Sequence, residues 1–238
     1  MLIDTNSPFY AAVAIGSTKV TGMVGRVDSE GAVNVLSYVA VSSADFIRKG
    51  RVYNVDKMTQ CLKNIRKRLE DQINCDIKQV YVALNCQGMR SITHIEERTF
   101  PQRITVQQEL IESLKADNRD KISHDQILID TLPQEYTMGA FSTIEPVGVM
   151  TDRIRAQFLN IVCNASAIEA IESCFRKAGL PIVRHTMAAD RLANVMTDEK
   201  ERSTGCAFVE MGSETTTVAV YRGKLLRHFA VLPLGGQN

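Results

Sequence analysis

The chain lacks an excess of charge of either sign. Its 28 lysines and arginines nearly balance 27 aspartates and glutamates, which gives a formal net charge of +1 over 238 residues. A nearly neutral chain has no broad electrostatic field for a nucleic acid or an anionic membrane, although local patches remain open. We therefore expect no nucleic-acid partner.

Metal-binding and nucleophile motifs are also absent. The six cysteines are scattered without a CxxC pair, and no histidine lies near them at metal-ligand spacing. The four histidines lie far apart, and Glu135 has no second carboxylate at helical spacing. We predict a reduced, cytosolic protein with no metal site and no catalytic residue.

Neither a secretory signal nor a membrane-spanning stretch is evident. The N-terminal segment carries Asp4 and no basic region, and no apolar run approaches the roughly 18 residues that a membrane helix needs. The chain as given is therefore expected to be soluble.

What the sequence does contain is an alternation of strand and helix patterns. Runs rich in valine, alanine and isoleucine, separated by turn-like clusters, predict a three-stranded meander over 10–15, 20–27 and 32–41. After Asn54, a good N-cap, apolar residues recur at helical spacing from Met58 to Ile73, and 79–84 has the composition of a buried strand. This order indicates an α/β fold.

The middle of the chain is more polar and predicts an inserted module over 93–157. The patterns favour strands at 91–100 and 126–131, a helix at 106–117, and loops around Pro133 and Pro146. Beyond the module, a strand is expected at 153–163, and Ser166–Glu169 is typical of a capping box that opens a helix. A strand, a short helix and a second meander then follow at 182–186, 188–196, 205–211, 216–222 and 225–232.

Both meanders turn at a Gly-Ser pair, in Val13-Ala-Ile-Gly-Ser-Thr-Lys19 and in Val209-Glu-Met-Gly-Ser-Glu-Thr215. Such turns point backbone N–H groups outward, glycine permits close approach and hydroxyls add donors, so two facing turns could clamp a triphosphate. A single Gly-Ser hairpin is more often a plain turn, and no Walker A pattern is present. The candidate ligand-binding residues are Gly16, Ser17, Thr18, Lys19, Gly212, Ser213, Glu214, Thr215 and Thr216.

Several segments together resemble FtsA, the actin-like bacterial cell-division family, nearly from end to end. The most specific are Leu132-Pro-Gln-Glu-Tyr136 with the following Pro146-Val-Gly148, and Leu226-Arg-His-Phe-Ala-Val-Leu-Pro-Leu-Gly-Gly236. Others are Ala14–Val20, Gly50–Asp56 and Leu192–Glu201. The resemblance implies an actin-like, ribonuclease H-like mixed sheet with flanking helices: subdomain IA over 1–92 and 158–198, an inserted small α+β 1C module over 93–157, and the start of IIA over 199–238.

The resemblance also implies a function. The family tethers FtsZ to the cytoplasmic membrane at the division site, recruits later division proteins for septum formation, and uses ATP and Mg²⁺. It implies that the 1C module contacts other division proteins and further copies of the chain. The family's FtsZ-binding surface, adenine-binding segment and C-terminal membrane helix would follow Asn238, so we expect the sequence to be an N-terminal fragment with an uncovered sheet face near its end.

Both turn segments depart from the family pattern. Ala14 stands where relatives carry an aspartate, and Glu210-Met-Gly-Ser-Glu-Thr-Thr-Thr217 replaces Asp-Ile-Gly-Gly-Gly-Thr-Thr-Asp. Because Mg²⁺ is held through carboxylates and phosphate oxygens, we expect weak ATP binding, and weak or absent ATPase activity. Glu214 is expected to repel a phosphate as well.

Two other functions stay open. One is a phosphotransferase of the same superfamily, such as a sugar or acid kinase, although Ala14 and Thr217 leave vacant the carboxylate positions that such chemistry needs. The other is a pilus-assembly protein similar to PilM, against which the segments at 132–136 and 226–236 weigh.

Overall fold

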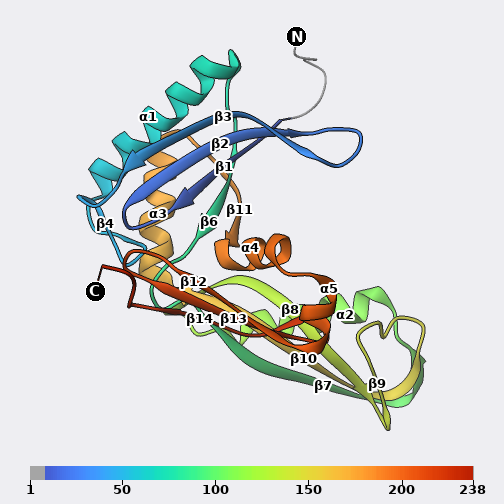
Figure 1. Ribbon diagram of the computed structural model, residues 1–238. Helices are drawn as coiled ribbons and strands as arrows, with labels where there is room; N and C mark the ends of the chain where they lie inside the picture. Colours follow the sequence, from blue (N-terminus) through green and yellow to red (C-terminus); the bar gives the residue numbers. More distant parts are fainter. Residues whose placement is uncertain (1–8, 238) are drawn as a thin grey trace.

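A five-stranded mixed sheet forms the upper lobe of the computed structural model, which describes residues 9–237 (Figure 1). The strand order is β11-β6-β1-β2-β3. The predicted meander is confirmed, because β1 (Phe9–Ile15), β2 (Lys19–Val27) and β3 (Val33–Ser42) pair antiparallel in sequence order. Strands β6 (Val80–Leu84) and β11 (Ile182–Met187) run parallel to β1 and to each other.

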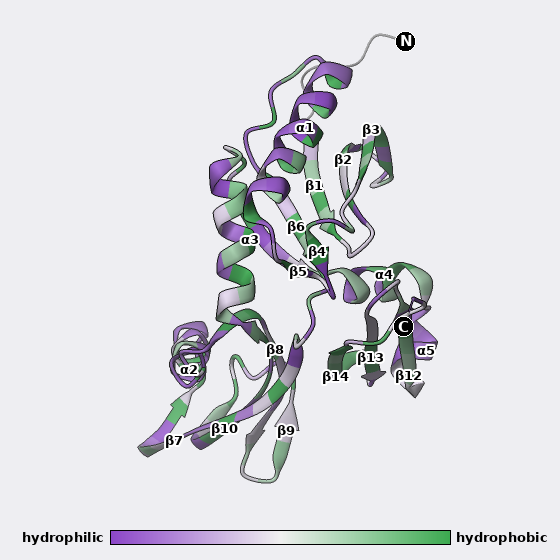
Figure 2. Ribbon diagram, turned by 90° about the vertical axis from the view of Figure 1, so that its left-hand side faces the viewer, coloured by the Kyte–Doolittle hydropathy of each residue, from purple (hydrophilic) through white to green (hydrophobic). Residues whose placement is uncertain are grey.

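Two helices cover one face of this sheet. Helix α1 (Val55–Ile73) begins at the predicted N-cap, where the Asn54 side chain accepts a hydrogen bond from the backbone N–H of Lys57. It packs on α3 (Ala165–Lys177) and on β2 and β3, with its polar residues outward (Figure 2). A Cβ at Gly22 would lie 2.3 Å from Cγ2 of Ile65, so only glycine lets α1 sit this close to β2.

Helix α3 is capped two residues earlier than the sequence predicts. The Asn164 side chain accepts from the backbone N–H of Ser166 at 3.1 Å, so Asn164 is the N-cap. The predicted capping box from Ser166 to Glu169 is therefore wrong. Asparagine competes well for this position, and here it also ends the preceding strand.

A seven-stranded sheet forms the lower lobe, in the order β12-β13-β14-β7-β10-β8-β9. Its outer half contains β7 (Arg90–Thr105), β8 (Gln126–Met138), β9 (Phe141–Thr143) and β10 (Met150–Asn164), with α2 (Gln108–Asp120) against one face. Pro133 lies inside β8 rather than in the predicted loop. The pairing of β8 with β10 is irregular between Gln157 and Phe158, and Pro133 pairs with Phe158 at that irregularity, where a missing N–H is tolerated.

The predicted boundaries at 92/93 and 157/158 fall within β7 and β10, which continue from the module into the body of the protein. Along β10, Ile154, Ala156 and Phe158 pack in a core beneath α2. The alternate residues Leu159, Ile161 and Cys163 belong to the main core that includes α1 and α3. The division into subdomains IA, 1C and IIA stays a prediction.

The second meander is confirmed as β12 (Cys206–Met211), β13 (Thr216–Arg222) and β14 (Leu225–Leu232). It joins the rest of the lower sheet through the pair Ala230 and Arg90. Helix α4 (Ala188–Met196) and the unpredicted α5 (Glu199–Thr204) connect the two lobes. The Tyr221 hydroxyl on β13 donates to Oδ1 of Asp190 at 2.9 Å, which fixes α4 on this meander.

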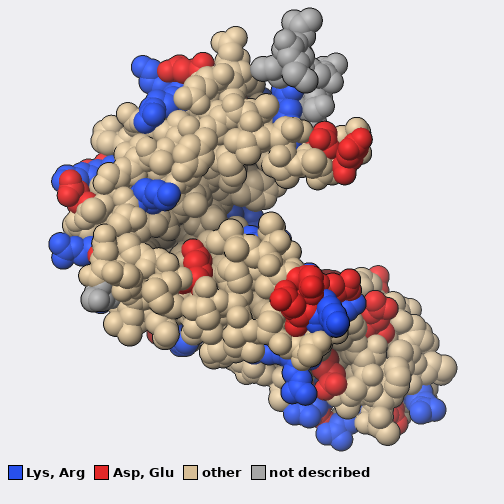
Figure 3. Space-filling model, in the orientation of Figure 1, with Lys and Arg blue, Asp and Glu red and all other residues tan. Residues whose placement is uncertain are grey.

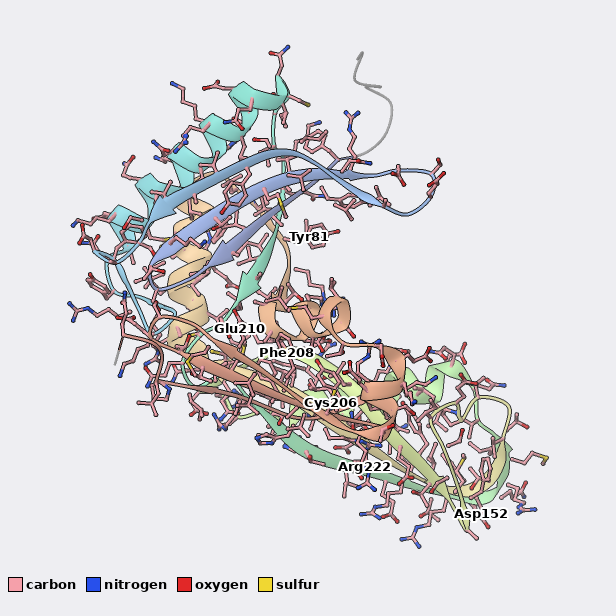
Figure 4. The ribbon with its side chains drawn as sticks, viewed as in Figure 1. Tyr81, Asp152, Cys206, Phe208, Glu210 and Arg222 are labelled. Carbon is pink, nitrogen blue, oxygen red and sulfur yellow. The ribbon has the colours of Figure 1, made fainter. Side chains whose placement is uncertain are left out.

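One face of the second meander is uncovered, as expected. Val209 is 54% exposed and Met211 is 72% exposed, while Val218 and Val220 are half-buried. A second uncovered face lies on the upper sheet, where Tyr10, Tyr38 and Tyr81 are exposed. Figure 3 shows a hollow between the lobes, and Figure 4 places Tyr81 on the side of the upper lobe that borders it. Whether these surfaces drive self-association stays a prediction, which light scattering can test.

In the described part of the chain, no helix combines the length and the apolar character needed to cross a membrane.

Candidate phosphate-binding site

The fold brings the two Gly-Ser turns to one cavity between the lobes. The first turn joins β1 to β2 and the second joins β12 to β13. The cavity has a volume of about 240 Å³, and seven of the nine predicted residues line it: Gly16, Ser17, Thr18, Lys19, Gly212, Ser213 and Thr215. Larger hollows of about 480 and 680 Å³ lie beside α3 and α1, away from both turns.

The first turn is held by residues that follow it closely in sequence. The backbone N–H of Gly16 donates to the carbonyl of Lys19 at 3.1 Å, and a Cβ at Gly16 would lie 2.9 Å from that oxygen. The Ser43 hydroxyl donates to the carbonyl of Gly16 at 2.7 Å, and Oγ of Ser17 accepts from the N–H of Gly50 at 3.1 Å. The turn is therefore fixed on both sides.

The second turn has the same backbone closure. The N–H of Gly212 donates to the carbonyl of Thr215 at 2.8 Å. Its outer side is held by the segment after β14, where the N–H groups of Gly236 and Gln237 donate to the carbonyls of Gly212 and Ser213. This segment approaches the turn so closely that its first glycine is required: a Cβ at Gly235 would lie 2.5 Å from the carbonyl carbon of Ser213.

A polar network that the sequence did not reveal crosses the cavity between the lobes. Nδ2 of Asn85, just after β6, donates to Oε2 of Glu210 at 3.2 Å, and the Thr217 hydroxyl donates to Oδ1 of Asn85. Burial raises the pKa of the Glu210 carboxyl, and the hydrogen bond from Asn85 offsets part of that rise. Figure 4 shows Glu210 near the end of β6. The one signal in the sequence that could have pointed to Asn85 was its position, as a polar residue directly after a buried strand.

The donor set suits phosphate groups better than a metal ion. Among the described residues that line the cavity, Lys19 is the one cation and Glu210 the one carboxylate, while Ala14 contributes a methyl group. In residues 9–237 no group of three or more His, Cys, Asp or Glu side chains could hold a metal. Mg²⁺ bound here would depend on Glu210 and on oxygens of a phosphate ligand.

Two predicted site residues point elsewhere. Oε2 of Glu214 accepts from the backbone N–H of Lys49 at 2.6 Å, and the Thr216 hydroxyl donates to the carbonyl of Leu234 at 2.7 Å. Neither residue lines the cavity. The carboxylate is turned toward the other lobe, so the structure provides no direct contact between Glu214 and the cavity. The expected repulsion of a phosphate by its charge stays a prediction.

No protein-family model matches the chain. Curated sequences match it over almost its entire length. "Cell division protein FtsA" from Porphyromonas gingivalis is 28% identical over 233 residues, and these cover 96% of the chain and 49% of the relative. The Escherichia coli protein of that name is 27% identical over 243 residues, covering 99% of the chain and 56% of the relative.

The chain is similar to FtsA. It spans about half the length of the FtsA relatives that it matches. Its structure resembles that in the PilM-PilN type IV pilus biogenesis complex with a TM-score of 0.59 and 16% identity, covering 96% of the chain and 62% of that structure. At this identity the likeness shows the fold alone, which is the actin-like α/β fold implied by the sequence resemblance to FtsA.

Proposed function

We propose that the chain acts in cell division as an actin-like scaffold similar to FtsA, rather than as an enzyme. The observation that carries the proposal is sequence similarity to cell division proteins over 96–99% of the chain. The shape of the site supports it, because two glycine turns face one cavity that contains a single carboxylate.

The proposed ligand of the cavity is the phosphate chain of ATP, held weakly. The hydroxyls of Ser17 and Thr215 and the Lys19 ammonium line the cavity and complement phosphate oxygens, and turns of this kind are expected to add backbone N–H donors. Ala14 and Thr217 replace the carboxylates that the family uses for Mg²⁺, so we expect binding weaker than micromolar and weak or absent hydrolysis. Calorimetry with Mg-ATP tests this, and low-micromolar binding would contradict it.

The partners follow from the same resemblance. We propose that residues 93–157 contact later division proteins or further copies of the chain. For the relatives, we propose that the part beyond the region matched by this chain contacts FtsZ and the inner face of the cytoplasmic membrane. A lysate pull-down with the chain, compared with a variant that carries Glu109→Lys and Arg119→Glu at exposed positions of α2, identifies which partners depend on the module.

Depletion of the gene product in its own bacterium tests the division role. We expect long cells without septa, rescued by the wild-type gene. Rescue by a Gly16→Val variant should fail if the first turn matters, because a side chain there would collide with the carbonyl of Lys19. Normal septation after depletion would overturn the proposal.

A phosphotransferase activity is the alternative that the site keeps open. Glu210 is a partly buried carboxyl with a raised pKa at the cavity, which is the property of a general base. A coupled assay of ATP consumption across small sugars and carboxylic acids decides between the two functions. Turnover that Glu210→Gln abolishes would favour the kinase.

The similarity to PilM does not favour a role in pilus assembly. It rests on a structure only 16% identical in sequence, whereas the FtsA relatives are 27–28% identical over the same residues.

A further inference from the structure

A small hairpin lies between the two Gly-Ser turns and contacts both. It consists of β4 (Ile47–Arg48) and β5 (Arg51–Val52), which pair antiparallel around Lys49 and Gly50. The N–H of Gly50 donates to Oγ of Ser17 in the first turn, and the adjacent N–H of Lys49 donates to Oε2 of Glu214 in the second. Two successive backbone groups therefore hold one side chain from each turn.

The hairpin is anchored on the upper lobe and cannot shift easily. Lys49 and Gly50 have φ values of 50° and 71°, the left-handed pair that a tight two-residue hairpin needs. The N–H of Gln87 donates to the carbonyl of Lys49 at 3.0 Å. A Cβ at Gly50 would lie 2.3 Å from the carbonyl oxygen of Asn85, so the turn is packed directly on the backbone after β6.

Glu214 reaches this hairpin from the other lobe, 165 residues away in sequence. At 2.6 Å its bond to the N–H of Lys49 is a short contact between a carboxylate and a backbone donor. A further link joins β12 and β13, which flank the second turn, to the upper lobe: Asn85 is hydrogen-bonded to Glu210 and to Thr217. Together these contacts join the second turn and its strands to the upper lobe at two places beside the cavity.

We propose that Glu214 is a positioning residue, which holds the second turn against the β4–β5 hairpin and so keeps the cavity at the width that a phosphate chain needs. The inference rests on the proposed phosphate-binding function of the cavity. It reverses the role expected from sequence: loss of Glu214 should loosen the site rather than remove a repulsive charge.

Two variants separate these roles. Glu214→Ala removes the acceptor and the charge, whereas Glu214→Gln removes the charge and keeps an oxygen that can accept from Lys49. Amide hydrogen exchange without any ligand reads the contact directly. We expect the Lys49 amide to exchange about tenfold faster in Glu214→Ala, the effect of losing a hydrogen bond to a charged group. In Glu214→Gln we expect an exchange rate only about threefold faster than wild type, because a neutral acceptor keeps about half of that effect.

The Gly16 amide, bonded to the carbonyl of Lys19 within the first turn, is the internal control and should keep its exchange rate in both variants. An unchanged Lys49 amide in Glu214→Ala would overturn the proposal. So would equal acceleration in both variants, because the charge and not the contact would then be responsible.

Binding of inorganic tripolyphosphate, measured by calorimetry, tests the consequence for the site. We expect Glu214→Ala to bind at least about fivefold more weakly than wild type, and Glu214→Gln to bind within about twofold of it. Tighter binding by both variants would restore the repulsive role and overturn the inference. If wild type binds no tripolyphosphate, the proposed phosphate site fails, while the exchange rates of Lys49 still decide whether Glu214 holds the two lobes together.

Discussion

The two Gly-Ser turns have similar sequences and the same backbone closure, but they are held in place differently. The first turn contacts Ser43 and Gly50, which follow within 35 residues along the chain. The second turn contacts Gly235–Gln237 on its outer side and, through Glu214, the distant Lys49. A local pattern is enough to specify the turn, whereas its surroundings depend on which distant segments the fold brings to it.

The strongest way to break the second turn alone is Gly235→Ala. The added Cβ would meet backbone atoms of Ser213 and Glu214 at 2.5 Å, and backbone cannot move aside as a flexible side chain can. We expect the free energy of unfolding to fall by about 3 kcal/mol or more in urea titrations. Gly31→Ala is the matched control: its φ is +83° and nothing lies within 4 Å, so the loss should be only about 1 kcal/mol. Equal losses would contradict the close approach.

Asn85→Ala should have the next largest effect, and it tests the link between the second turn and the upper lobe. It would leave the partly buried Glu210 carboxyl and the buried Thr217 hydroxyl without their partner. We expect a loss of about 2 kcal/mol in unfolding free energy. Asn64→Ala, on the exposed side of α1, should change it by less than about 0.5 kcal/mol. A loss as small as that of the control would show that Asn85 is dispensable.

The two turn serines provide a direct comparison with a smaller effect. The Ser17 hydroxyl is buried and accepts from Gly50, whereas within residues 9–237 the Ser213 hydroxyl makes no hydrogen bond to another protein group. Ser17→Ala should therefore lower the free energy of unfolding by about 1 kcal/mol and Ser213→Ala by less than about 0.5 kcal/mol. Chemical denaturation of both variants checks the difference. Equal values would mean that the turns are held alike.

The smallest effect concerns the pH dependence of stability. Burial raises the native pKa of Glu210 above 4.5, so the native state binds this proton more tightly than the unfolded chain does. The stabilisation that this raised pKa provides is complete below pH 4.5, the pKa in the unfolded chain, and it is lost as the pH rises through the native pKa. Compared with Glu210→Gln, wild type should thus lose stability between about pH 4 and about pH 7, as urea titrations at both values would show. A constant difference between the two proteins would contradict the raised pKa.

Much of the fold was predictable from local patterns. Period-two and helical spacing located both meanders and α1, and Asn54 was correctly predicted as a cap, because these features depend on neighbouring residues. The two errors have different causes, one a distant strand pairing and the other a local competition between two capping residues. Pro133 lies within β8 because its partner strand is irregular there, and Asn164 caps α3 because β10 ends at that residue.

The sequence by itself determined that two glycine turns would form and which small, hydroxyl-bearing residues they would contain. Only the tertiary structure decided that both turns line one cavity, that Asn85 joins Glu210 to Thr217 across it, and that Glu214 turns away from it to Lys49. The physical reason is the distance along the chain over which each feature is determined. A turn is fixed by the backbone preferences of a few adjacent residues, whereas the direction of a charged side chain is set by whichever donor the folded chain places within hydrogen-bonding distance.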